Sequence, residues 1–69
     1  MTDHVYKHIE ITGTSSASLQ EAIEKAVARA AKTVQNMRWF EVLDSRGKIE
    51  NGSISQWQVT IKIGFTLND

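Results

Sequence analysis

Residues 39–67 read WFEVLDSRGKIENGSISQWQVTIKIGFTL, and this stretch decides the fold. Asn51-Gly52 lies between two runs of alternating apolar and polar residues, which is the strongest short signal of a β-hairpin. We therefore predict one strand from Trp39 to Glu50, a two-residue turn, and a second strand from Ser53 to Leu67.

The turn sets the register of this hairpin, because two turn residues pair Glu50 with Ser53. Paired positions then sum to 103. Apolar pairs fall on one face and an opposite-charge pair on the other, as a half-buried sheet requires: Phe40 with Ile63, Val42 with Ile61, and Glu41 with Lys62.

A further strand and a turn are predicted near the N-terminus. Apolar and polar residues alternate from His4 to Thr12. Lys7 interrupts the apolar side, so we expect this strand to begin beyond the core. Gly13 to Ser16 has the composition of a turn.

A helix is predicted from the end of that turn to about Asn36. Ser15 and Ser18 both qualify as its N-cap, and Ser18 forms a capping box with Glu21. One stripe of the helix is apolar and includes alanines that allow a sheet to approach closely: Leu19, Ala22, Ile23, Ala26, Val27, Ala30, Val34 and Met37.

These elements predict an α+β fold with the order β-α-β-β. Antiparallel pairing throughout requires the last strand in the middle of a three-stranded sheet, in the order 1-3-2. The last strand, of about 15 residues, spans roughly 50 Å, whereas the helix, of about 18 residues, spans roughly 27 Å. The sheet must therefore curl around the helix, and its overhanging ends should contact other subunits.

The composition limits the classes of function. A single domain, 1–69, of this size is marginal alone and needs disulfides, a metal or oligomerisation. There is no Cys, and the two His lie on a predicted strand, so self-assembly is the remaining route. The 8 basic and 8 acidic residues argue against nucleic-acid binding. Without a signal peptide or an apolar run of ~20 residues, we expect no membrane association and a cytoplasmic location.

Two side chains on the outer face of the hairpin are candidates for ligand binding. Trp39 lies opposite Gly64, which leaves one side of the indole uncrowded, and it either packs against a neighbouring subunit or stacks on a ligand. Gln58 carries donors and an acceptor suited to the edge of a heterocycle, or is an ordinary solvated glutamine. The register places Gln58 opposite Ser45, roughly 20 Å from Trp39, so a shared site must combine subunits.

Basic residues are candidates for contacts to anions. Arg46 lies opposite Trp57 in the predicted register and forms either a cation–π pair or a phosphate contact. Lys25, Arg29 and Lys32 follow one side of the helix, either as a solvated face or as a site for a phosphate-bearing ligand. The sequence has no recognisable set of nucleophile, acid and base and no metal-ligand cluster, so we expect neither an enzyme nor a metal site.

Short strings along nearly the whole chain resemble the dodecins in order and spacing: Tyr6-Lys7, Ile9-Glu10-Ile11, Gly13-Thr14-Ser15, Ala28-Arg29-Ala30, Trp39-Phe40-Glu41-Val42, Arg46-Gly47, Gln58-Val59 and Gly64-Phe65. The resemblance implies a hollow homo-dodecamer that binds flavins. It further implies that the flavin rings stack in pairs between Trp side chains of symmetry-related subunits.

The resemblance also implies roles for individual residues. Trp39 stacks on the flavin ring, Gln58 bonds to its edge, and Arg46 lies near the flavin, as in bacterial members that favour the mononucleotide FMN. Lys7 is a further flavin-binding candidate. Some bacterial members also hold coenzyme A, and the matching positions here are Tyr6, Arg29 and Thr33.

Two positions depart from the family pattern. Arg38 precedes Trp39, where bacterial relatives commonly have an acidic residue, and Thr66 stands where many have Arg. Arg38 thereby becomes a candidate for the phosphate, and riboflavin and FAD become alternatives to FMN. The hypothesis is a flavin storage and buffering protein that quenches flavin photochemistry. The alternatives are a carrier of coenzyme A and flavin, or a structural shell in which Trp39 is interface packing.

Overall fold

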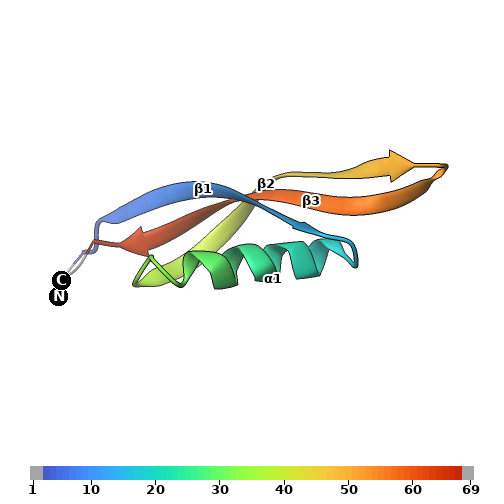
Figure 1. Ribbon diagram of the computed structural model, residues 1–69. Helices are drawn as coiled ribbons and strands as arrows, with labels where there is room; N and C mark the ends of the chain where they lie inside the picture. The colour runs from blue at the N-terminus through green and yellow to red at the C-terminus, as the bar shows by residue number, and fades with distance from the viewer. Residues whose placement is uncertain (1–2, 68–69) are drawn as a thin grey trace.

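The computed structural model of the protein describes residues 3–67 and has the predicted architecture (Figure 1). One helix packs against a three-stranded antiparallel sheet with the strand order β1-β3-β2. In chain order the elements are β1 (Tyr6–Ser15), α1 (Leu19–Ala30), β2 (Met37–Glu50) and β3 (Ser53–Thr66). The predicted α+β fold and its strand order are confirmed.

The first strand lies later in the chain than predicted. β1 begins at Tyr6 rather than at His4 and continues to Ser15, through most of the stretch predicted as a turn. Residues 13–15 pair with residues 57–59 of β3. The small polar residues there have turn composition, but pairing with a long neighbouring strand keeps them extended.

Gly13 allows β1 to cross directly over α1. A Cβ atom at this position would overlap the carbonyl oxygen of Ala22 and lie 2.9 Å from the Cβ atom of Ala26. Because one of these neighbours is backbone, we expect Gly13→Ala to lower the free energy of unfolding by about 1–3 kcal/mol. Chemical denaturation at a fixed protein concentration measures this change.

Gly47→Ala is the matched control for that substitution. A Cβ atom at Gly47 would come no closer than 3.3 Å to the carbonyl oxygen of Gln56 and 3.7 Å to Ile54. We expect a clearly smaller loss of stability for this variant. Equal losses for the two alanine variants would contradict the close packing of β1 on α1.

α1 begins at a predicted cap. The Ser18 hydroxyl oxygen accepts the backbone N–H of Glu21 at 3.0 Å. Ser15 supports the same turn from the end of β1: its Oγ accepts the backbone N–H groups of Ala17 at 2.9 Å and Ser18 at 3.3 Å, and its hydroxyl donates to the Glu21 carboxylate. Both predicted capping serines therefore take part, and Ser18 is the N-cap.

The C-terminal end of the helix was predicted wrongly. α1 ends at Ala30, not near Asn36. The N–H groups of Lys32 and Thr33 bond to carbonyls three residues earlier, those of Arg29 at 3.2 Å and Ala30 at 3.0 Å, so the chain tightens as the helix ends. Asn36 then adopts a left-handed conformation with φ of 65°, which asparagine tolerates better than most residues, and the chain turns into β2.

The hairpin register is confirmed at both ends of the β2–β3 pair and wrong between them. Residues 39–42 and 49–50 have the predicted partners. Leu43 is an extra residue on β2, and Ser55 is an extra residue on β3 that restores the original register. Between these two bulges, residues 44–48 are shifted by one position. Alternating polarity does not reveal a pair of compensating insertions.

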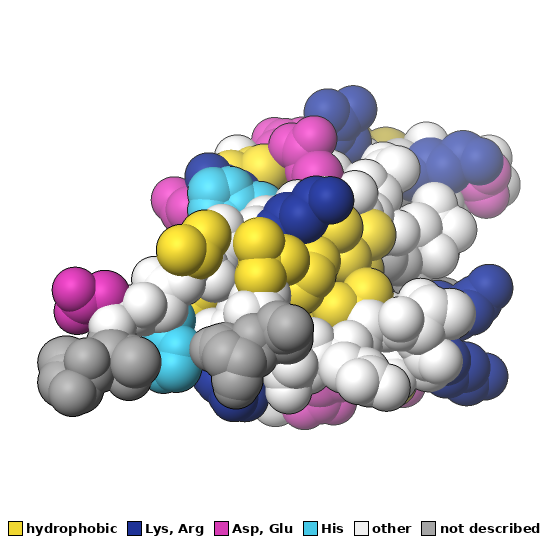
Figure 2. All heavy atoms as spheres, turned by 90° about the vertical axis from the view of Figure 1, so that its left-hand side faces the viewer, with side chains coloured by type: hydrophobic (Ala, Val, Ile, Leu, Met, Phe, Trp, Pro, Cys, Tyr) yellow, Lys and Arg dark blue, Asp and Glu magenta, His cyan; other side chains and the backbone are white. Residues whose placement is uncertain are grey.

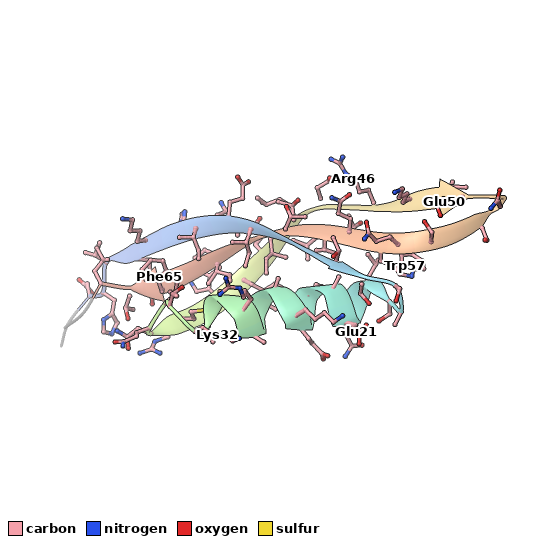
Figure 3. All side chains as sticks on the ribbon, viewed as in Figure 1. Glu21, Lys32, Arg46, Glu50, Trp57 and Phe65 are labelled. Atoms are coloured by element: carbon pink, nitrogen blue, oxygen red, sulfur yellow. The ribbon has the colours of Figure 1, made fainter. Side chains whose placement is uncertain are left out.

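This shift changes which residues meet. Arg46 pairs with Gln58, and Gly47 pairs with Trp57, so the predicted pairs Arg46–Trp57 and Ser45–Gln58 are wrong. A bulge also reverses which side chains face each side of a strand. Figure 3 accordingly shows Arg46 on the side of the sheet away from α1, and Trp57 on the side toward α1.

The core is small and lies where α1 contacts β1 and β3. Its buried residues are Ala22, Ala26 and Ala30 of the helix and Val59, Ile61 and Ile63 of β3. No residue of β2 is buried, and the far part of the β2–β3 hairpin extends past α1 (Figure 1). Asn51 and Gly52 form its tip with φ values of 51° and 79°, as a two-residue hairpin turn requires. The predicted overhang is confirmed, and its contact with other subunits stays a prediction.

Candidate functional site

The face of the sheet away from α1, here called the outer face, is mainly polar. Its members follow from the strand register and the alternation of side chains: Tyr6, His8, Glu10, Thr12 and Thr14 of β1, Gln56, Gln58, Thr60, Lys62, Gly64 and Thr66 of β3, and Trp39, Glu41, Asp44, Arg46 and Lys48 of β2. Lys62 and Glu41 form an ion pair at 3.6 Å, and the hydroxyls of Thr12 and Thr60 are 2.9 Å apart. The face has an aromatic end and a polar end.

The aromatic end is the group Tyr6, His8 and Trp39, centred on Gly64. Gly64 pairs with His8 on one side and with Trp39 on the other. A Cβ atom at Gly64 would overlap the six-membered ring of Trp39 and lie 2.7 Å from its Nε1, so the indole lies across the glycine. Ring centroids are 5.5 Å apart for His8 and Trp39 and 6.5 Å apart for Tyr6 and Trp39, both with edge geometry.

Gly64 has a different role from the one predicted. The space above it is not free, because the indole occupies it and rests one side of the ring on β3. The Trp39 residue is nevertheless 39% exposed. Figure 2, which views the end of the molecule with both termini, shows hydrophobic side chains gathered beside His and Lys or Arg side chains. The indole thus has a supported side and an open side.

His8 was missed in the sequence, and Tyr6 was assigned there to a different ligand. Alternation along β1 places both on the outer face. Their meeting with Trp39 depends on the β1–β3 register, in which His8 pairs with Gly64 and Tyr6 with Thr66. A strand that pairs across a long connection has no turn to set its register, so local sequence signals could not find this group.

The polar end of the outer face consists of Asp44, Arg46 and Gln58. Arg46 and Gln58 are direct partners, and the bulge at Leu43 brings Asp44 and Arg46 to this face. Arg46 donates from Nε at 2.9 Å and from Nη2 at 2.7 Å to the same Asp44 oxygen, Oδ2. A carboxamide and a guanidinium therefore stand side by side, with the guanidinium already engaged by a carboxylate.

The two ends of the outer face are too far apart for one small ring. Gln58 and Gly64 lie six positions apart on β3, which corresponds to roughly 20 Å along a strand. As predicted, one chain alone cannot both stack a heterocycle on Trp39 and bond its edge with Gln58. A site that uses both ends must take them from different copies of the chain.

The remaining flavin candidates lie apart from the polar end. Arg38 is an extra residue between the paired positions Met37 and Trp39, and it lines a depression of about 230 Å³ with Val27 and Phe40. This irregularity relaxes strict alternation beside Trp39. Lys7 is exposed and pairs with Phe65, on the helix side of the sheet and away from the outer face.

The coenzyme A candidates are divided between two places. Arg29 and Thr33 line a hollow of about 520 Å³ between α1 and β1, together with Lys25. Tyr6 lies on the outer face against Trp39 instead. The hollow has two cationic side chains, so its chemistry suits an anion, but one chain does not bring Tyr6 to it.

In the described part of the chain, no helix has the length and apolar content that a membrane crossing requires. Among residues 3–67, no group of three or more His, Asp or Glu side chains is placed to hold a metal ion.

Comparison with known proteins identifies close relatives. A family model described as Dodecin matches residues 5–68. A dodecin from Thermus thermophilus is 43% identical over 65 residues, which cover 94% of this chain and 94% of that protein. The structure of dodecin from Streptomyces coelicolor matches with a TM-score of 0.92 and 42% identity, covering 100% of this chain and 99% of the other.

A more distant relative is the calcium dodecin of Mycobacterium tuberculosis. It is 29% identical over 63 residues, which cover 91% of this chain and 89% of that protein. Its crystal structure, which is described as having a calcium-binding site, matches with a TM-score of 0.79.

Proposed function

The chain belongs to the dodecin family, and from this premise we propose that it is a flavin-binding storage protein, with residues 1–69 as one binding domain. The family consists of small binding and storage proteins rather than enzymes, and membership implies an oligomeric assembly. The ligand we propose is FMN, with riboflavin and FAD as alternatives. It is held between the subunits of a homo-dodecamer.

The observation that carries this proposal is the position of Trp39. The indole rests on the strand at Gly64, is bordered by His8 and Tyr6, and keeps an open side. A large aromatic ring supported in this way on a polar face offers a stacking surface for a flat heterocycle. An aromatic pair contributes about 0.5–1.5 kcal/mol beyond the buried area. Close contact between flavin and indole also permits electron transfer that quenches the excited flavin, without any catalytic acid or base.

Gln58 is proposed to bond the edge of the flavin ring that stacks on Trp39 of another subunit. Trp39 and Gln58 of one chain are roughly 20 Å apart, so the two side chains that contact one flavin ring must come from different subunits. An amide side chain supplies both donors and an acceptor, which match the alternating groups of a heterocycle edge. Oligomerisation would then complete the site as well as cover the overhanging hairpin.

Arg46 is proposed to contact the FMN phosphate. It is the partner of Gln58 on the outer face, so a ligand bonded by Gln58 lies close to the guanidinium. Charge-assisted contacts of this kind are stronger than neutral hydrogen bonds and weaken as salt rises. Arg38, beside Trp39, and Lys7, at the start of β1, are secondary candidates for contacts with the flavin.

Sedimentation velocity with added riboflavin tests the proposal. We expect flavin absorbance to move with a species far heavier than the 7.8 kDa chain, and the fluorescence of the bound flavin to be quenched. A dominant monomer or dimer at micromolar concentration would contradict the assembly. A heavy species that leaves riboflavin, FMN and FAD all free in solution would contradict flavin storage and favour a structural shell.

Coenzyme A carriage is a second candidate function, favoured by the hollow beside β1. Lys25 and Arg29 line it with Thr33, and its volume is about 520 Å³. Such a lining suits the phosphates of coenzyme A. Because this hollow lies on the helix side, a bound anion there would leave Trp39 available for flavin.

A further inference from the structure

Asp44 and Arg46 form a contact that bears on which flavin the protein prefers. Both lie on β2 just past the bulge at Leu43, so both face the outer side beside Gln58. The Nε and Nη2 groups of Arg46 both donate to Oδ2 of Asp44, at 2.9 and 2.7 Å. The side chains of Arg46 and Asp44 remain 67% and 47% exposed, respectively, so the pair is accessible to a ligand.

This contact occupies part of the guanidinium. Arginine has five N–H donors in a planar fork, and the Nε–Nη2 edge is one of the sides that can hold a phosphate through two parallel hydrogen bonds. Asp44 takes that edge. A phosphate that reaches Arg46 must displace the carboxylate, or use the remaining donors while lying close to a second negative charge.

We propose that Asp44 is a specificity-determining residue that weakens the preference of the protein for a phosphorylated flavin. Asp44 competes with the ligand phosphate for Arg46 and repels its charge. FMN and riboflavin therefore differ less in affinity than an unpaired Arg46 would make them. This inference rests on the proposed function, because it assumes that flavin binds near Gln58 and Arg46.

The test compares riboflavin and FMN titrations of Asp44→Asn with those of the wild type. Asparagine keeps the size of the side chain and removes its charge. Exposed ion pairs are individually weak, so we expect FMN to bind about two- to fivefold more tightly, with riboflavin affinity unchanged. The difference in FMN affinity between Asp44→Asn and the wild type is largest at low ionic strength, where charges are least screened.

Glu41→Gln is the matched control. Glu41 lies on the same face and strand but pairs with Lys62 at 3.6 Å, so its substitution changes the net charge equally without freeing Arg46. We expect no change in the ratio of FMN to riboflavin affinity. The double variant Asp44→Asn, Arg46→Ala should lack the gain in FMN affinity that Asp44→Asn shows alone, because that gain acts through the guanidinium.

Three results would overturn this inference and leave the proposed function standing. The first is an equal gain in FMN affinity in Glu41→Gln, and the second is a gain in FMN affinity that persists in the double variant. The third is an FMN affinity that Asp44→Asn leaves unchanged or lowers. Absence of both riboflavin and FMN binding to the wild type would instead overturn the proposed function, and this inference with it. Flavin binding by the wild type thus separates the two failures.

Discussion

Replacing Trp39 by leucine is expected to weaken riboflavin binding about tenfold and to remove most of the fluorescence quenching. Stacking of a base on an aromatic side chain contributes about 1–3 kcal/mol by substitution, and about 1.4 kcal/mol corresponds to a factor of ten. In the proposed site the indole is both the stacking surface and the electron donor, so we expect affinity and quenching to be lost together. Titration of riboflavin fluorescence measures both.

Trp57→Leu is the control for that variant. It removes the same ring from the helix side of the sheet, where Trp57 pairs with Gly47 and lines a depression with Leu19 and Ile54. We expect quenching to be unchanged. Equal losses in the two leucine variants would contradict the assignment of Trp39 as the stacking residue.

Replacing Gly64 by alanine is expected to reduce riboflavin affinity by about fivefold or more, although the indole is still present. The new Cβ atom would overlap the Cε2 and Cζ2 atoms of Trp39 and lie 2.7 Å from its Nε1. The ring must therefore leave its place against β3 and His8, and a stacking surface that is no longer held in position binds less tightly. Riboflavin titration gives the change in affinity.

A double variant shows whether this effect acts through the indole. In a Trp39→Leu background, Gly64→Ala should cause little further loss, because the two substitutions disable the same surface. A full additional loss would mean that the alanine disturbs the sheet rather than the ring. Sedimentation of each variant checks that the oligomer still assembles.

Much of the fold follows from local patterns. Asn51-Gly52 predicted the hairpin because a two-residue turn needs positive φ angles, and these two residues adopt them. The alanine stripe predicted a helix packed closely on the sheet, and Ala22, Ala26 and Ala30 are buried there. The outer-face position of Trp39 and Gln58 also followed from alternation along their strands. The position of Arg46 did not, because the bulge at Leu43 reverses the alternation that it follows.

The sequence by itself thus determined the order of elements, the strand order, a helix start at one of two capping serines and the outer-face position of Trp39. These features depend on residues near one another in the chain, through turn angles, capping bonds and side-chain period. Only the tertiary structure decided where α1 ends, that β1 continues past Gly13, and that Arg46 meets Gln58. It also decided that His8 borders Trp39, because each of these depends on contacts between distant segments, whose register and spacing no local pattern encodes.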